Sequence, residues 1–153
     1  MNKEKTIDVL NTLIQINNDR IEGYETASKE TEDDDLATLF SQFTHTSQKC
    51  NAELITEVQK LGGSPITGTK ASGKIYRVWM DFKALVTGND RKAILNSCEY
   101  GEQVAIETYE DALENNSEDI SSEQQLMLKA QCEQIKSNHA TVKSLLEALM
   151  EEV

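Results

Sequence analysis

The sequence predicts an all-α protein: a four-helix bundle whose second and third helices are joined by a long crossover containing a short helix. Apolar residues recur at alternating intervals of three and four over four long stretches of the 153-residue chain. The one proline, Pro65, and most of the glycines fall between residues 62 and 88. Antiparallel neighbours in a bundle need only about 2–8 linking residues. The longer connection over 62–89 therefore predicts parallel second and third helices, and residues 1–153 are expected to form a single domain.

The first helix is expected from about Thr6 to Lys29, with one polar residue, Asn17, on its core face. That face reads Ile7, Leu10, Ile14, Asn17, Ile21, Tyr24. Residues 30–35, all acidic except Thr31, separate it from the second helix, and one of the aspartates is expected to cap that helix. The second helix is expected over about Asp35 to Leu61, and its core face reads Leu36, Phe40, Phe43, Ser47, Cys50, Leu54, Val58, Leu61. The glycines and proline of residues 62–65 are typical of a helix end.

The crossover carries its own helical pattern. Ile75, Trp79 and Phe82 recur at helical spacing, and Gly88 follows them. This predicts a short amphipathic helix lying across the bundle, with Trp79 as its anchor.

The third and fourth helices each carry one ionisable residue on an apolar face. Asn89 or Asp90 is expected to cap the third helix, which ends near Asn115; its core face reads Leu95, Cys98, Glu102, Ala105, Tyr109, Ala112. Ser121 with Gln124, or Ser122 with Gln125, has the spacing of a capping box for the fourth helix. Its core face reads Leu128, Cys132, Ile135, His139, Val142, Leu146, Leu149. We expect Glu102 and His139 to be buried and partnered, since an unpaired buried charge is costly.

Composition narrows the functional classes. A net charge of −12 argues against nucleic acid as a partner, and no apolar run is long enough to span a bilayer. Three cysteines and no secretory pattern at the N-terminus favour a cytoplasmic protein without disulfides. For self-association, the hypothesis is a homodimer.

Several motifs together resemble a known family. They are the residues at 18–24, 61–65, 79–84, 87–88, 98–102, 109–113 and 136–139, which read NDRIEGY, LGGSP, WMDFKA, TG, CEYGE, YEDAL and KSNH. Over nearly the whole chain the sequence is similar to small bacterial ferritin-like four-helix-bundle proteins that form a domain of unknown function. The resemblance implies a ferritin-like bundle and says little about activity.

The ferritin-like pattern needs one Glu on each of two helices and a Glu-x-x-His on each of the other two. Glu102 and, less centrally, Glu22 match the single carboxylates. The other positions hold Gln48-x-x-Asn51 and Lys136-x-x-His139, so we expect no standard di-iron centre, and the cofactor is unknown. Glu102, His139 and Glu22 are the candidate metal ligands that remain. Glu102 could instead pair with Lys136 or His139 in a structural network.

Two further readings concern other core residues. Cys98, Glu102, Cys132 and His139 could form a soft-ligand metal site, although buried cysteines are more often packing residues. Tyr24 and Tyr109 are expected to be core residues with hydrogen-bonded hydroxyls rather than redox tyrosines.

Two functional hypotheses follow. The first is a ferritin-like protein with a degenerate di-metal site, acting in stress physiology or metal handling. The second is a non-catalytic bundle that binds protein partners, with exposed parts of the crossover helix as its contact surface. The sequence contains no glycine-rich phosphate loop and no supported Ser-His-Asp arrangement.

Overall fold

The computed structural model describes residues 2–68, 74–88 and 90–151. Over these residues the chain forms five α-helices, one 3-10 turn and no β-strand: α1 (Lys3–Glu30), α2 (Asp34–Lys60), α3 (Lys74–Val86), α4 (Arg91–Asn115), η1 (Ser117–Asp119) and α5 (Ser122–Glu151). The protein is therefore an all-α bundle, as predicted. None of the helices in the described ranges is both long enough and apolar enough to cross a membrane.

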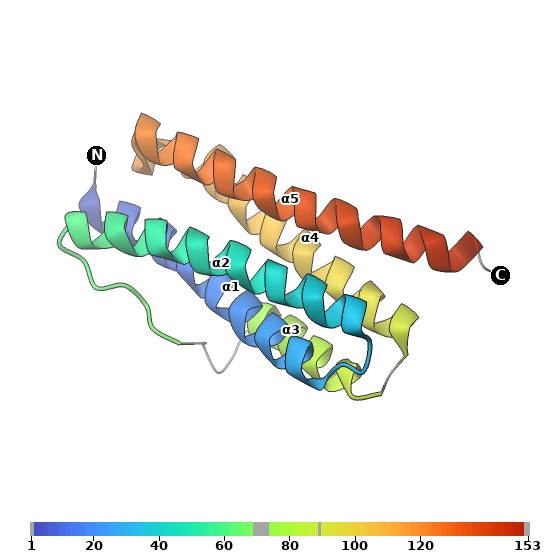
Figure 1. Ribbon diagram of the computed structural model, residues 1–153. Helices are drawn as coiled ribbons and strands as arrows, with labels where there is room; N and C mark the ends of the chain where they lie inside the picture. Colours follow the sequence, from blue (N-terminus) through green and yellow to red (C-terminus); the bar gives the residue numbers. More distant parts are fainter. Residues whose placement is uncertain (1, 69–73, 89, 152–153) are drawn as a thin grey trace.

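The four long helices form two antiparallel pairs, α1 with α2 and α4 with α5 (Figure 1). The direction of the chain in Figure 1 shows α2 and α4 running the same way, as the long crossover predicted. The short α3 packs against both α1 and α4. It runs alongside α1 rather than across the bundle, which corrects the predicted orientation.

The helix ends follow local backbone chemistry. The Asn2 side chain accepts a hydrogen bond from the backbone N–H of Glu4 at 2.9 Å, which lets α1 begin at Lys3, before the predicted start. The reciprocal bonds between Ser121 and Gln124 form the expected capping box of α5. Asp33 holds the capping position of α2 without a side-chain cap bond. Its carboxylate instead lies 3.3 Å from Arg91.

The second helix ends in a tight glycine turn. Gly62 has a φ of +78°, a conformation that costs little only for glycine. The N–H of Gly63 donates to the carbonyl of Val58 and that of Gly62 to Gln59, each at 3.0 Å. These two bonds satisfy carbonyls that would otherwise lack partners at the helix end.

The apolar core is divided into two clusters. One consists mainly of aliphatic residues of α1, α2, α4 and α5 near the N-terminal end of α1. The other contains most of the aromatic rings, including Tyr24, Phe40, Trp79 and Phe82. A layer of buried polar side chains lies between them, because Arg20 falls between Ile16 of the first cluster and Tyr24 of the second.

Trp79 anchors α3, as predicted, with only 2% of its surface exposed. Its ring fits a notch made by glycines of two different helices. A Cβ added at Gly23 would lie 2.8 Å from the ring, and one at Gly101 would lie 2.9 Å from it. The notch lets α3 approach α1 and α4 closely enough for Trp79 to contact Tyr24 edge-on, with ring centroids 5.0 Å apart.

A buried polar layer as the candidate functional site

An ion pair between Arg20 of α1 and Glu102 of α4 lies at the centre of the bundle. Arg20 Nη2 donates to Glu102 Oε1 at 2.7 Å, and both side chains are fully buried. Arg20 Nη1 donates to Ser47 Oγ of α2 at 2.5 Å. A single guanidinium thus connects three helices.

Glu102 accepts a second hydrogen bond from Tyr24. The Tyr24 hydroxyl donates to Glu102 Oε1 at 2.5 Å and lies 3.0 Å from Cys98 Sγ. Burial, with Cys98 and Glu102 close by, raises the pKa of Tyr24 well above its usual value. Burial and the charge of Glu102 also raise the pKa of Cys98. Both groups therefore keep their protons at neutral pH, and Cys98 is a poor nucleophile.

The hydrogen bonds continue from Ser47 across the core. Ser47 Oγ donates to Asn17 Oδ1 at 2.8 Å, and Asn17 Nδ2 donates to the Tyr109 hydroxyl at 2.9 Å. Tyr109 then donates to Gln131 Oε1 of α5 at 2.7 Å. Gln131 Nε2 donates at 3.0 Å to Glu53, an exposed residue of α2. We call the connected side chains the polar layer: Asn17, Arg20, Tyr24, Ser47, Glu102, Tyr109 and Gln131.

Opposing effects set the charge state of Arg20. Burial is the largest single effect and disfavours the guanidinium, but the charge and hydrogen bond of Glu102, with the effects of Tyr24 and Cys50, together outweigh it, so the pKa of Arg20 is raised overall. Arg20 therefore stays protonated beside Glu102 inside the core. Burial also raises the pKa of Cys50, beside the layer, to about 11.

The partner of Glu102 differs from the two that we predicted. Lys136 is half-exposed and pairs with Glu110 at 3.4 Å and Glu133 at 3.6 Å. His139 lies 3.7 Å from Glu99, with 20% of its side chain exposed, so its predicted burial in the core is wrong. Its neighbours on the same predicted face, Ile135 and Val142, are fully buried, so the departure is confined to His139, whose imidazole lies beside Glu99 instead of entering the core.

The remaining candidate ligands are dispersed. Glu22 lies on the outer side of α1 and accepts from Lys83 of α3 at 2.9 Å. Cys132 lies by a surface hollow that Lys136 also lines. Within the three described ranges, no three His, Cys, Asp or Glu side chains are grouped so that they could hold a metal ion. The metal assignment of Glu102, His139 and Glu22 stays a prediction.

The polar layer does not fit the ferritin-like di-metal pattern. Such a site gathers carboxylates and histidines from all four helices around two cations. Here the carboxylate of Glu102 already faces a cation, and the polar layer takes Ser47 from α2 and Gln131 from α5, neither of which is a carboxylate or a histidine. A divalent ion at Glu102 would meet the positive charge of Arg20 at close range.

Sequence reasoning missed Arg20 as a core residue. The predicted core face of the first helix took Ile21, but Arg20 is fully buried and Ile21 is half-buried. The spacing contained a signal, because Arg20 lies three residues after Asn17 and four before Tyr24. An inward Arg also supplies the cation that Glu102 requires.

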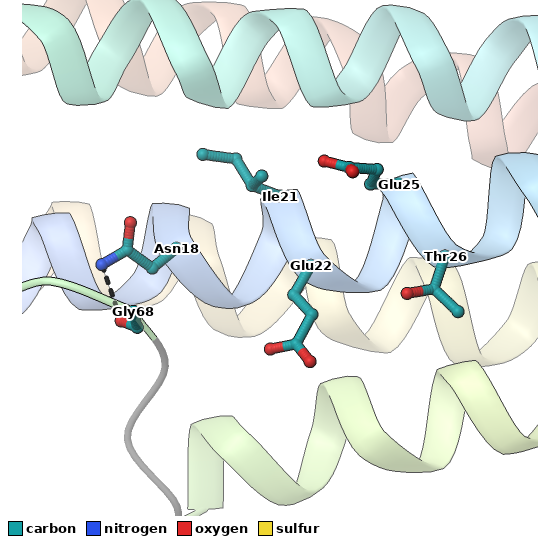
Figure 2. A pocket seen from close by; sticks show the side chains of 6 residues that line it. All are labelled: Asn18, Ile21, Glu22, Glu25, Thr26 and Gly68. Carbon is teal, nitrogen blue, oxygen red and sulfur yellow. Dashed lines mark hydrogen bonds between the residues drawn. The ribbon is translucent and has the colours of Figure 1, made fainter.

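A separate hollow of about 450 Å³ lies on the outer side of α1. Figure 2 shows its lining residues, with the Glu22 side chain directed towards α3 and Glu25 directed to the other side of α1. Asn18 Nδ2 donates to the carbonyl of Gly68 at 2.8 Å. The hollow contains no member of the polar layer.

Comparison with known proteins identifies the family. No curated protein matches the chain. A family model described as a domain of unknown function (DUF2383) matches residues 5–115, more than half of the chain. The matched range contains Arg20, Glu102, Trp79 and both glycines of its notch. The chain therefore belongs to the family described as domain of unknown function DUF2383.

Proposed function

We propose that this protein is a ferritin-like bundle that performs no di-metal chemistry and acts as a non-catalytic, partner-binding bundle. The observation that carries the proposal is the fully buried Arg20–Glu102 pair. An internal guanidinium supplies the positive charge that metal ions supply in ferritin-like sites. Fixed donors and acceptors on four helices also favour one packing arrangement, a role that buried polar groups have in some proteins.

Thermal unfolding with added metal ions tests this proposal. Circular dichroism melts would be recorded with Mn, Fe, Co, Ni, Cu or Zn, one divalent ion at a time. A ligand that binds only the folded state raises the melting temperature. We expect none of these ions to raise it, in the wild type or in the matched variant Glu102→Gln. A rise with one ion in the wild type that is lost in Glu102→Gln would refute the proposal.

One observation favours the second candidate, the handling of a single metal ion. Glu102 Oε2 is buried and has no hydrogen-bond partner among the described residues. An ion bound at that oxygen would leave Arg20 Nη2 on the other oxygen, Oε1. The melts described above distinguish this candidate, because it requires the ion-specific rise that the first proposal excludes.

The partner surface of the proposed bundle lies on α3. Met80 and Leu85 expose 37% and 39% of their surfaces there. If the partner is a second copy, light scattering should find a dimer for the wild type and a monomer for Met80→Ser/Leu85→Ser. A wild-type monomer at high concentration would rule out the homodimer. A dimer for both the wild type and the variant would show that the dimer interface does not include Met80 and Leu85.

A further inference from the structure

A carboxylate is buried where α1 meets α3. Asp19 of α1 exposes only 2% of its surface. It lines a narrow hollow between the two helices, which is shared by Glu22 and Gly23 of α1 and by Trp79, Met80 and Lys83 of α3. Among the described residues, no helix other than these two contributes to the lining. The short helix α3 therefore covers one side of Asp19.

Asp19 has no ion-pair partner in the part of the chain that the structure describes. Its Oδ1 accepts one hydrogen bond, from Gln15 Nε2 at 3.1 Å, and its Oδ2 accepts none from the described residues. Lys83, the basic residue of the same hollow, lies 2.9 Å from Glu22. Burying a charge without an opposite charge beside it is costly. The contact between α1 and α3 therefore favours the protonated, neutral form of Asp19.

The charged groups around Asp19 either oppose its ionisation or are already paired. On the core side, Glu102 of α4 faces Arg20, the residue that follows Asp19. From α2, the side chain that Arg20 contacts is the uncharged Ser47. Burial, together with the negative charge of Glu22, raises the pKa of Asp19 from 3.8 to about 6, although the hydrogen bond that Asp19 accepts acts in the opposite direction. With α3 in place, Asp19 is therefore mostly neutral until the pH exceeds about 6.

We propose that Asp19 makes the attachment of α3 to α1 dependent on pH, with α3 held more tightly when Asp19 is protonated than when it is ionised. When α3 moves away, water reaches the carboxylate and the ionised form is no longer penalised. Ionisation therefore shifts the equilibrium towards an opened α3. The glycine notch of Trp79 and the ion pair of Lys83 with Glu22 also attach α3, so ionisation loosens the helix without releasing it.

The direction and size of the effect follow from the coupling between ionisation and opening. A carboxyl group whose pKa is raised in the closed state stabilises that state at low pH, and the contribution is lost as the pH rises from about 4 to about 6. The two pKa values, 3.8 and about 6, differ by about two units, so the equilibrium constant for opening should rise by up to about 100-fold. This inference goes beyond the proposed function, because it requires neither a partner nor a metal-free centre.

Hydrogen exchange of the backbone amides of α3 measures this opening. Exchange would be followed across the range of pH and corrected for the intrinsic chemical rate at each pH. In the wild type, the protection of α3 should fall by up to about 100-fold between about pH 4 and about pH 6 and then level off. Asp19→Asn should abolish this fall, whereas the control Asp81→Asn, at an exposed position of α3, should retain it. Protection that stays constant or rises with pH would overturn the proposal, as would a fall that persists in Asp19→Asn.

A magnetic resonance titration assigns the effect to Asp19 with α3 in place. Trp79 is the only tryptophan and lines the same hollow, so its indole N–H gives one identifiable signal. The signal should titrate with a midpoint near pH 6 in the wild type. Glu22→Gln should move the midpoint to lower pH, because the charge of Glu22 raises the pKa of Asp19. A wild-type midpoint near 3.8, the ordinary value for an aspartate, would overturn the proposal.

Discussion

Removing the cation from the polar layer should destabilise the protein strongly. Arg20→Met keeps much of the side-chain length and its apolar stem but deletes the guanidinium. In the variant, Glu102 would keep only the hydrogen bond from Tyr24, and Ser47 would lose the donor at 2.5 Å. The buried carboxylate would then have no compensating charge.

The magnitude follows from the geometry. At 2.7 Å, two unit charges attract by about 6 kcal/mol with an effective dielectric constant of about 20. Burial costs several kcal/mol for each ion, so the intact pair contributes little net stability. Deleting one partner removes the attraction and leaves the burial cost of the other, and such changes typically cost about 3–5 kcal/mol.

A double-mutant cycle in urea provides the assay. Arg20→Met and Glu102→Leu should each lower the free energy of unfolding by about 3–5 kcal/mol, because each leaves its partner buried without a compensating charge. The milder variant Glu102→Gln, measured beside the cycle, should cost about 1.5–3 kcal/mol. Arg20→Met with Glu102→Leu removes both charges and should recover most of the loss, because apolar replacement of a whole buried pair is often nearly neutral. A loss below about 0.5 kcal/mol for Arg20→Met, the usual scale of surface substitutions, would refute the reasoning.

Three further predictions concern the glycine notch around Trp79, Trp79 itself and the buried Asp19. Urea unfolding measures all three. Gly23→Ala and Gly101→Ala should each destabilise by about 1–3 kcal/mol through overpacking against Trp79; a gain of about 1 kcal/mol, normal for this change inside a helix, would contradict the notch. Trp79→Ala should cost about 3–5 kcal/mol, and a cost below about 0.5 kcal/mol would remove its anchor role. Burial raises the pKa of Asp19 from 3.8 to about 6, so its contribution to stability falls as pH rises from about 4 to 6. Asp19→Asn should then be more stable than the wild type at pH 7.5, by up to about 3 kcal/mol, with the difference shrinking below pH 4; equal stability at pH 7.5 would count against a raised pKa.

Most of the fold could be predicted from the sequence, because each long helix repeats its apolar spacing many times. Local chemistry alone predicted the end of α2, at its glycine turn, and the start of α5, at the Ser121–Gln124 capping box. The Trp79 anchor could also be predicted, because it is the largest apolar side chain of the crossover. The largest change in a helix boundary is at the start of α1, where the Asn2 cap extends the first turn.

The candidate site could be predicted only in part, for physical reasons. The place of Glu102 on an apolar face indicates that it needs a partner. Which residue is that partner depends on which helices are neighbours and on which of their residues lie level with Glu102 along the bundle axis. Arg20 was overlooked because arginine is almost always exposed and an apolar residue, Ile21, is next to it. The pairing of Gly23 with Gly101 around one ring depends in the same way on contacts between helices.

The central claim is that Arg20, and not a pair of metal ions, neutralises the centre of this bundle. The most direct measurement is the aerobic addition of Fe(II) to purified protein, followed by desalting and elemental analysis. The account predicts no stoichiometric oxidation burst and no iron retained in proportion to the chain. Two irons retained per chain, with the absorbance of a di-iron centre, would contradict it.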